Sequence, residues 1–258
     1  LKIAAFTITR NEPLFLRVWC NYYCKVFGEK NVHIIDNSTS DDSVRIVQEL
    51  YPNINVIVKP NPKEHDSMFL KNTVEKMQRD LLRSNDFVVF SETDEFLLPS
   101  QNYVDLNDYC EKFHSSSKKW VRAQGWNIVQ QVDSEPSIER TIGSHLLKDR
   151  NSMWKITIYS KTLITKVPLT YQKGFHIIYD KGQKVATEIP DEDLSLLHAW
   201  RIDADEYFRR HSMRYKITYD QVIEYFKTHK MDWSPLLDPH AEGPETPVPD
   251  HWKQLIYV

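Results

Sequence analysis

Short apolar runs and helical patterns alternate along the first hundred residues of this chain. The apolar runs cover residues 2–8, 32–35, 54–58 and 87–90. Helical patterns follow the first three runs, over residues 13–28, 43–50 and 66–83. Continuous β-prone runs of this length are typical of strands buried inside a parallel sheet. The alternation therefore predicts right-handed βαβ units and an α/β fold with a mostly parallel sheet.

The first helix has a start signal and a stop signal. Pro13 suits its first turn, where the missing backbone N–H has no partner to lose. Asn11 is the predicted N-cap, and Gly28 ends the pattern.

The pattern changes after residue 100. Residues 120–132 and 154–164 predict longer strands with polar interruptions, in an antiparallel arrangement at the sheet edge. Residues 203–230 carry helical patterning, with these core candidates: Tyr207, Phe208, Ile223, Tyr225 and Phe226. Residues 233–249 hold five prolines and predict an arm without regular structure.

An acidic segment follows the fourth predicted strand directly. Glu92, Asp94 and Glu95 stand in four positions, before the apolar residues 96–99, which predict a turn. Ligands of open α/β sheets bind beyond the carboxyl ends of the strands, and crowded carboxylates repel one another unless they share a cation. Glu-x-Asp therefore predicts a site for Mg²⁺ or Mn²⁺, with a solvated acidic loop as the alternative. Glu95 is expected to point away and support the turn.

Composition limits the classes of partner. Lys and Arg number 33 against 36 Asp and Glu, a net charge of −3, which does not indicate a nucleic-acid or membrane partner. No apolar run approaches the roughly 18 residues of a membrane span. The first residue is Leu1, so we expect that an upstream anchor, as in membrane-anchored enzymes, would lie outside this chain. Three cysteines without metal spacing favour a reducing compartment, with Cys20 and Cys24 as small buried hydrophobes.

Four segments carry a resemblance to a known family. They are FTITRNE, IIDNSTSDDS, FLKN and SETDEFL, in this order along the chain. Together they resemble nucleotide-sugar glycosyltransferases of the GT-A fold, in the family-2-like group. The resemblance covers residues 1–100 and continues weakly through GFH at 174–176 and LLHAW at 196–200.

The resemblance implies a Rossmann-like, GT-A-like fold with a mostly parallel sheet flanked by helices and an antiparallel acceptor-side portion. A single domain would then span residues 1–258. Its parts are a nucleotide-sugar-binding half (1–100), an acceptor-side half (101–232) and a proline-rich arm (233–258).

The resemblance also implies a metal site that binds Mn²⁺ or Mg²⁺. It assigns Asp94 as a direct ligand, and Glu92 as a ligand, a water-mediated contact or a ribose contact. Glu92 stands where the family usually has Asp, so its longer side chain changes the reach. His198 is either a further metal ligand or a hydrogen-bonded core histidine.

The resemblance places the nucleoside at the ends of the first two strands. Thr9, Asn11 and Glu12 would border the base and ribose, and Asp36 would meet the uracil edge. Asn11 and Asp36 can equally cap the next helices. Lys71 is expected at the diphosphate or at an acid of the metal loop, or as an exposed helix lysine.

The general base is not assigned by the sequence. His176 is a candidate for a ligand, an acceptor contact or a structural role, and the other base candidates are Asp180, Glu188, Asp191 and Glu192. Residues 181–193 are expected to form a lid. Three tryptophans are expected either to stack on sugars or to be buried: Trp126, Trp154 and Trp200.

The predicted activity is metal-dependent transfer of a sugar from a nucleotide-diphosphate donor, with UDP favoured, to a hydroxyl of a glycan or other acceptor. A catalytically degenerate module that binds glycans or acts as a scaffold is the main alternative. A nucleotidyltransferase is disfavoured because TITRNEP lacks a Gly- and Arg/Lys-rich phosphate loop. A glycoside hydrolase would not need the two nucleotide-binding turns.

Overall fold

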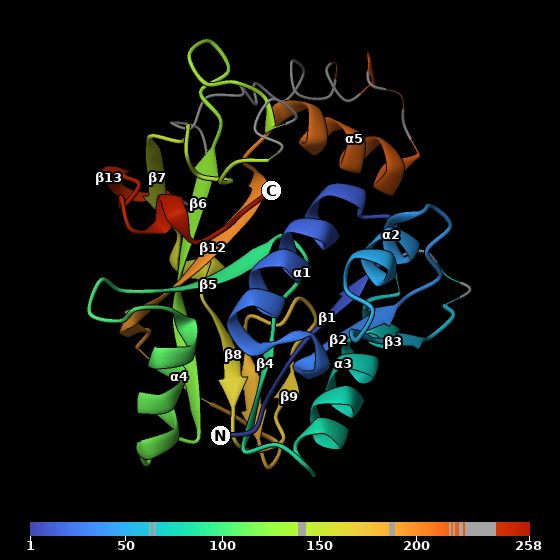
Figure 1. Ribbon diagram of the computed structural model, residues 1–258, viewed down its shortest axis with the longest axis vertical. Coiled ribbons are helices and arrows are strands. Elements are labelled where there is room, and N and C mark those ends of the chain that lie inside the picture. Colours follow the sequence, from blue (N-terminus) through green and yellow to red (C-terminus); the bar gives the residue numbers. More distant parts are fainter. Residues whose placement is uncertain are drawn as a thin grey trace.

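A computed structural model of the chain describes residues 1–61, 63, 66–138, 143–185, 189–216, 218, 220–221, 224 and 241–258 (Figure 1). Its strands are β1 (Ile3–Thr9), β2 (Val32–Asp36), β3 (Asn55–Val58), β4 (Phe87–Phe90), β5 (Glu95–Pro99), β6 (Trp120–Val129), β7 (Ser152–Lys155), β8 (Lys161–Thr165), β9 (Thr170–Tyr171), β10 (Ile178–Asp180), β11 (Gln183–Lys184), β12 (Asp191–Arg201) and β13 (Glu242–Pro247). Its α-helices are α1 (Pro13–Phe27), α2 (Ser43–Leu50), α3 (Ser67–Leu81), α4 (Leu106–Ser115) and α5 (Ala204–Tyr215). The predicted strands and helices of the first ninety residues are confirmed, with ends shifted by one or two residues.

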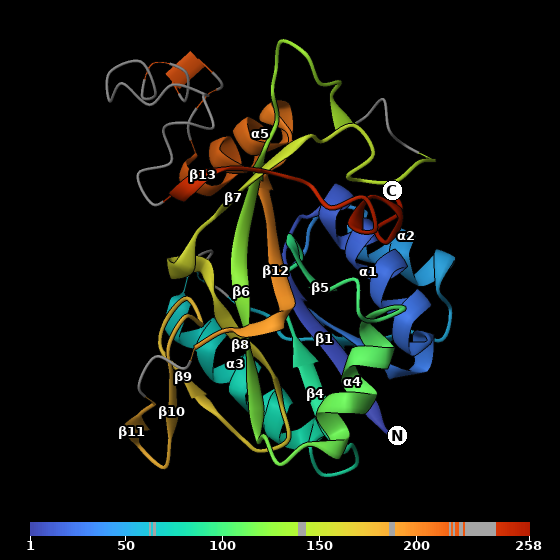
Figure 2. The same cartoon turned by 90° about the vertical axis from the view of Figure 1, so that its left-hand side faces the viewer.

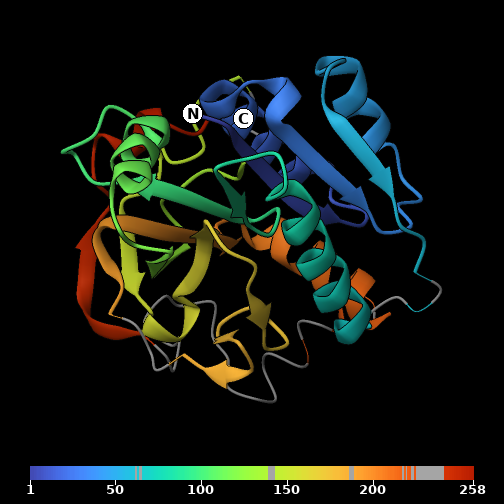
Figure 3. The same ribbon diagram turned by 90° about the horizontal axis from the view of Figure 1, so that it is seen from below.

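The first four strands form the parallel part of the main sheet, in the order β4-β1-β2-β3. Helices α1 and α2 cover one face of this part, and α3 covers the other face (Figures 2 and 3). Strands β1 and β4 are therefore buried on both faces, which explains why their sequences are continuous apolar runs.

The second half of the chain extends the same sheet in the antiparallel direction. Strand β8 pairs with β4, and the sheet continues through β6, β7 and β13. Strand β12 lies between β5 and β6, antiparallel to the first and parallel to the second. The predicted fold class is confirmed: an α/β sheet with a parallel central part flanked by helices, and an antiparallel portion.

Helix α1 fixes the acidic loop after β4 to the body of the sheet. Trp19 and Tyr23 are fully buried, one helical turn apart. The Trp19 indole N–H donates to Ser91 Oγ at 2.8 Å, and the Tyr23 hydroxyl accepts from the backbone N–H of Leu97 at 3.1 Å. Because buried polar groups need partners, these two bonds hold both ends of the loop against the helix.

Two predictions about the strands after β4 are wrong. Residues 96–99 do not form a turn but belong to β5, because β12 gives them a pairing partner, with Leu97 opposite Leu196. The expected strand over 154–164 is divided by the 3₁₀ turn Thr157–Tyr159. This turn crosses the backbone of Gly125 so closely that an added Cβ would lie 2.6 Å from the Ile156 carbonyl oxygen.

The proline-rich tail is also more regular than expected. Its strand β13 pairs antiparallel with β7, although it contains Pro244 and Pro247. Proline is tolerated there because β13 is an edge strand, where a missing N–H can face away from the ladder. Trp252 and Ile256 follow and are buried.

Helix α5 confirms part of the predicted helical region. Tyr207 and Phe208 are buried on it, as expected. The other three core candidates lie outside the described residues: Ile223, Tyr225 and Phe226.

Candidate functional site

The carboxyl ends of β1, β2 and β4 meet at one edge of the parallel sheet. Thr9 at the end of β1 lies opposite Asp36 at the end of β2. Strand β4 ends at Phe90, which pairs with Phe6 of β1, so the loop that carries Glu92 and Asp94 starts beside the end of β1. The predicted nucleotide and acid residues therefore come from adjacent strand ends, where α/β sheets bind ligands.

Asn11 and Asp36 hold the loop after β2 and do not cap helices. Asn11 has φ +55, and its Oδ1 accepts from the backbone N–H groups of Ser40 at 2.8 Å and Asp41 at 3.3 Å. Asp36 Oδ1 accepts from the backbone N–H of Thr39 at 2.8 Å. The predicted Asn11 cap is wrong: the N-cap position of α1 is Glu12, which makes no capping bond with its side chain.

Buried polar atoms without a hydrogen-bond partner gather around these strand ends. Among the described residues they include Thr9 Oγ1, Asn37 Oδ1, Thr39 Oγ1 and Asn61 Nδ2. The backbone N–H of Asn37 donates to the Thr9 carbonyl, and that of Asn61 donates to Ser38 Oγ, so the group is contiguous. Unpaired buried polar atoms point to a ligand or water that completes them. Asn37 and Asn61 were not predicted from the sequence.

Asp94 is held from three sides. Its Oδ2 accepts from Arg210 Nη1 at 2.6 Å and lies 3.9 Å from His198 Nε2. The backbone N–H of Ala199 donates to its carbonyl oxygen at 2.8 Å. Burial alone would raise the pKa of Asp94, but Arg210, His198 and Lys161 outweigh it and lower the pKa to about 2. Asp94 is therefore an anion at neutral pH.

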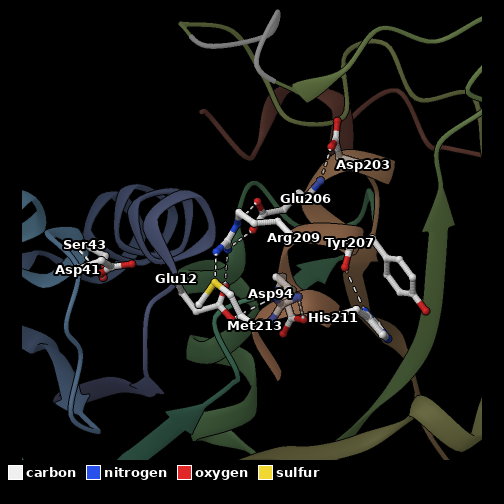
Figure 4. Close-up of polar contacts among 11 residues, drawn as sticks. Glu12, Asp41, Ser43, Asp94, Asp203, Glu206, Tyr207, Arg209, His211 and Met213 are labelled. Carbon is white, nitrogen blue, oxygen red and sulfur yellow. Dashed lines mark hydrogen bonds and ion pairs between the residues drawn. The ribbon is translucent and has the colours of Figure 1, made fainter. Parts of the chain in front are cut away.

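Glu12 shares Arg210 with Asp94. Its Oε1 lies 3.0 Å from both Nε and Nη2 of Arg210, and Arg209 Nη2 lies 3.9 Å from its Oε2. Figure 4 shows Glu12 and Asp94 beside the side chains of α5. Burial, with smaller contributions from the negative charges of Asp94 and Glu206, raises the pKa of Glu12 to about 7 against the opposing charge of Arg210.

Glu92 and Glu95 share a second internal cation. Lys161 Nζ lies 2.5 Å from Glu92 Oε2 and 2.6 Å from Glu95 Oε1. Glu95 is buried and also accepts from the backbone N–H of Glu92 at 3.2 Å, so it supports the loop as expected but does not point away from Glu92. Burial raises the pKa of Glu95 to about 7, opposed by Lys161.

The ring of Tyr159 lies near two histidine rings, those of His176 and His198. The Tyr159 centroid lies 4.9 Å from that of His198 and 6.4 Å from that of His176. Burial, followed by the charge of Lys161, lowers the pKa of His176 to about 4. Burial also lowers the pKa of His198 to about 4, against the opposing charge of Asp94. Both imidazoles are neutral at pH 7, and Nδ1 of each is buried without a hydrogen-bond partner among the described residues.

The predicted metal ligands fit a shared ion only in part. Two ligands at about 2.1 Å from one ion are at most about 4.2 Å apart, so Asp94 Oδ2 and His198 Nε2 fit at their separation of 3.9 Å. A neutral imidazole and a carboxylate also suit Mn²⁺. Glu92 Oε2 is paired with Lys161 at 2.5 Å, just as Asp94 Oδ2 is paired with Arg210 at 2.6 Å. In the described ranges no three His, Cys, Asp or Glu side chains form a group that could hold a metal ion.

Several predicted residues lie elsewhere. Lys71 Nζ binds Glu75 on its own helix at 2.7 Å, not the acidic loop. Asp191 binds Lys118 at 2.6 Å at the start of β12, seven residues before His198, and Glu192 follows it there. Strand spacing puts that end of β12 roughly 20 Å from His198.

Asp180 belongs to β10 in the small sheet β11-β10-β9. Glu188, within the expected lid, lies outside the described residues. Trp154 is buried, and Trp200 lies between two histidine rings, 5.7 Å from His198 and 6.1 Å from His211. Trp126 is half-buried.

Besides Asn37 and Asn61, sequence reasoning missed Arg210 and Lys161 of the candidate site. Arg210 lies 116 residues from Asp94 in the chain, and Lys161 lies 69 residues from Glu92. Neither belongs to a motif. The only local signals were the paired arginines of α5 and a lysine at the start of an apolar strand, and neither signal points to the acidic loop.

Comparison with known proteins finds only solved structures of low similarity. No protein-family model matches the chain. No curated protein matches it either. In the described part of the chain, no helix has both the length and the apolar character needed to cross a membrane.

The solved structures to which the chain is similar include the following three. TarS 1-349 from S. aureus with UDP is 14% identical over 64% of this chain and 47% of its own, with a TM-score of 0.35. The mannosyltransferase PcManGT from Pyrobaculum calidifontis with GDP-Man and Mn²⁺ is 14% identical over 50% and 35%, with a TM-score of 0.34. Glucosyl-3-phosphoglycerate synthase from Mycobacterium tuberculosis with UDP is 11% identical over 52% and 47%, with a TM-score of 0.34.

The chain spans less than half the length of each of these three structures. At such identities and TM-scores the likeness carries no argument about function. The function is therefore argued from this chain's own residues.

Proposed function

We propose that this chain is a glycosyltransferase that moves a sugar from a nucleotide-diphosphate donor, with uridine as the base, to a hydroxyl of a glycan or another acceptor. The observation that carries the proposal is the strand-end site. A contiguous set of unpaired buried polar atoms surrounds the ends of β1 and β2, and the anion Asp94 lies at the end of β4 beside His198.

The uridine assignment rests on Asp36. Asp36 stands at the end of β2, opposite Thr9. In the bond described above, the backbone N–H of Thr39 donates to Oδ1 of Asp36. A carboxylate accepts the single N–H of a uracil edge, while Asn61 Nδ2 is an unpaired donor that suits a uracil carbonyl. The orientation of this amide is fixed because Asn61 Oδ1 accepts from the backbone N–H of Lys63 at 3.0 Å.

The diphosphate assignment rests on Asp94 and His198. These two residues would hold Mn²⁺ or Mg²⁺, which would act as a Lewis acid on the departing diphosphate. Such ions are commonly bound by one or two protein ligands together with substrate phosphates, so a third protein ligand is not required. Asp94, as a permanent anion, contributes the charge, and His198 contributes a neutral nitrogen.

His176 is the proposed general base for the acceptor hydroxyl. Its ring centroid lies 6.4 Å from that of Tyr159, whose ring also lies 4.9 Å from His198, whereas Asp191 is bound to Lys118 far along β12. Its neutral imidazole can accept a proton, but a pKa of about 4 makes it a weak base. We therefore expect a modest contribution to the rate from proton transfer at His176.

One observation favours a second candidate, a catalytically degenerate module that binds nucleotides or glycans. Both carboxylates of the Glu92–Asp94 pair are already neutralised by the chain's own cations, Lys161 and Arg210. If these two ion pairs never dissociate, the site would bind a sugar but would not transfer it.

The test is release of UDP from a panel of UDP-sugars, measured with Mn²⁺ and with EDTA, with water and with simple glycosides as acceptors. The proposal predicts slow metal-stimulated release with at least one donor. Nucleotide binding without release of UDP from any donor would support the degenerate module instead. Asp80→Asn on α3 is a suitable control variant, because Asp80 pairs with Lys76 on the same helix at 2.5 Å.

A further inference from the structure

Arg210 is a cation placed inside the proposed donor site. It extends from α5, which follows directly after the strand that carries His198. Its Nη1 donates to Asp94 Oδ2 at 2.6 Å, its Nε and Nη2 lie 3.0 Å from Glu12 Oε1, and its guanidinium lies 5.0 Å from the centre of the Phe15 ring. The side chain is only 22% exposed, so these contacts replace most of its hydration.

The oxygen that Arg210 occupies is the one that faces His198. Both Arg210 Nη1 and His198 Nε2 approach Asp94 Oδ2, at 2.6 Å and 3.9 Å. An ion placed between Asp94 Oδ2 and His198 Nε2, the pair of atoms at 3.9 Å, would bind this same oxygen. Two cations on one partly buried oxygen repel each other strongly, because the local dielectric is low. Arg210 and a metal ion therefore compete for Asp94.

Arg210 has a second anchor that does not involve this oxygen. Two of its nitrogens contact Glu12 at the N-cap of α1, and the Phe15 ring lies against its guanidinium. If Nη1 leaves Asp94, Glu12 still keeps the guanidinium at the strand ends. A guanidinium held there presents N–H donors to the place where the proposed diphosphate binds, and its planar fork matches phosphate oxygens.

We propose that Arg210 binds Asp94 in the free protein and transfers to the donor's diphosphate when the donor and its metal ion bind. The inference rests on the proposed function, because it assigns Arg210 a role in binding the same donor. It makes Arg210 a donor-binding residue supplied by α5.

The exchange can be measured, because Arg210 should weaken the binding of the metal ion alone and strengthen the binding of the nucleotide with the metal ion. When a ligand needs a minor state of its site, its apparent affinity falls in proportion to the population of that state. Metal alone must displace Arg210 and should bind weakly. Metal together with UDP gains the contact between Arg210 and the diphosphate and should bind cooperatively.

The experiment measures the affinity of Mn²⁺ alone, by electron paramagnetic resonance, and that of UDP at saturating Mn²⁺, by calorimetry, on the full chain. In Arg210→Gln we expect Mn²⁺ alone to bind about tenfold more tightly, which corresponds to release of a competitor that occupies about nine-tenths of the sites. UDP at saturating Mn²⁺ should bind at least about tenfold more weakly, the loss expected for a charge-assisted phosphate contact. Arg214→Gln removes an exposed charge from the same helix and should change neither affinity.

Arg210→Lys keeps a cation next to Asp94 and Glu12 and protects the fold. It should shift both affinities in the same directions as Arg210→Gln but less, and it provides the same two comparisons if the Gln variant does not fold. Unchanged or weaker Mn²⁺ binding in both variants overturns the exchange, as does unchanged UDP binding. If the wild-type chain binds no UDP with Mn²⁺, the proposed function itself fails, and the two failures are thereby distinguished.

Discussion

The carboxylates at the strand ends differ in ionisation because each has different neighbours. Asp94 keeps a pKa of about 2 because Arg210, His198 and Lys161 outweigh its burial. Burial raises the pKa of Glu12 and that of Glu95 to about 7, although each has a cation of its own. Asp94 is thus the one of these three that stays fully ionised at neutral pH, which the proposed role as a metal ligand requires.

Asp94→Asn should reduce the affinity for UDP in Mn²⁺ by at least about tenfold, or 1.4 kcal/mol, because the neutral amide cannot hold the cation that neutralises the diphosphate. Calorimetric titration of the variant and the wild type gives the comparison. Asp80→Asn should bind UDP like the wild type. Equal affinities in wild type and Asp94→Asn would remove Asp94 from the site.

Asp36→Ala should weaken uridine nucleotides by about 1–3 kcal/mol, the range for loss of a hydrogen bond to a charged group. Nucleotides with other bases should be weakened less, because only the uracil contact is lost. Competition binding with UDP, CDP, ADP and GDP measures the difference. Equal weakening of all four would show that Asp36 acts only through the loop that it holds by its bond to Thr39.

The lowered pKa of His176 predicts that the protein becomes less stable as the pH falls. Burial, with help from Lys161 and Arg122, lowers its pKa from 6.5 to about 4 in the folded protein. The folded state therefore binds this proton less readily than the unfolded chain. The stability tied to the neutral imidazole is complete above pH 6.5 and is lost as the pH falls towards 4.

His176→Gln has no such titration, so it serves as the reference for the wild type. Urea unfolding of both proteins at about pH 7.5 and about pH 4.5 should show the wild type losing up to about 3 kcal/mol relative to the variant at the lower pH. An identical difference at the two pH values would contradict the burial of a neutral His176.

At the residue scale, the sequence predicted side chains that follow strand ends and missed those that arrive from elsewhere. Asp36 ends β2 and Asp94 directly precedes β5, while His198 lies within β12, three residues before its end. Arg210 and Lys161 reach the same acids across long chain separations. Only tertiary pairing of β8 and β12 brings them there, and no local pattern records that pairing.

At the scale of elements, apolar runs identified strands well where the strand is buried on both faces. Strand β5 was missed because an apolar segment that follows an acidic loop and ends in Pro99 is typical of a turn. In the structure this segment is a strand because it pairs with β12. Strand β13 was missed because prolines normally exclude strands, and its edge position is a tertiary property. Both segments are strands because another strand of the fold pairs with them.

The 3₁₀ turn between β7 and β8 depends on Gly125 of β6. A Cβ at this position would lie 2.6 Å from the Ile156 carbonyl oxygen and 2.7 Å from the Ser160 backbone nitrogen. Gly125→Ala should therefore destabilise the protein by at least about 1–3 kcal/mol, the usual cost of overpacking, since backbone atoms cannot move aside easily.

Thermal unfolding measures this effect, with Gly182→Ala as the control. Gly182 has φ +79 but open space around it, so its substitution isolates backbone strain from crowding. Gly125→Ala should lower the melting temperature more than Gly182→Ala does. A smaller fall would show that the turn is able to shift away from β6.

At the scale of the whole molecule, the two halves of the chain meet at the acidic loop. The N-terminal strands provide Thr9, Asp36 and Asp94 at one sheet edge, while β12 and α5 bring His198 and Arg210 to Asp94. The α/β class followed from the order of elements along the chain, and the same order places the proposed site beyond the strand ends. The pairing of the acidic residues with Lys161 and Arg210 could not be predicted from that order, because it depends on how β8 and α5 pack against the N-terminal strands.

Thermal melting of the whole chain with nucleotide diphosphates, each with Mn²⁺ and with EDTA, tests the central claim most directly. A ligand at 100 times its dissociation constant adds about 2.7 kcal/mol to the free energy of unfolding, which raises the melting temperature measurably. We predict that UDP with Mn²⁺ stabilises the protein more than UDP with EDTA or the other diphosphates with Mn²⁺. If no nucleotide changes the melting temperature under either condition, the strand-end site does not bind a nucleotide and the proposed function is wrong.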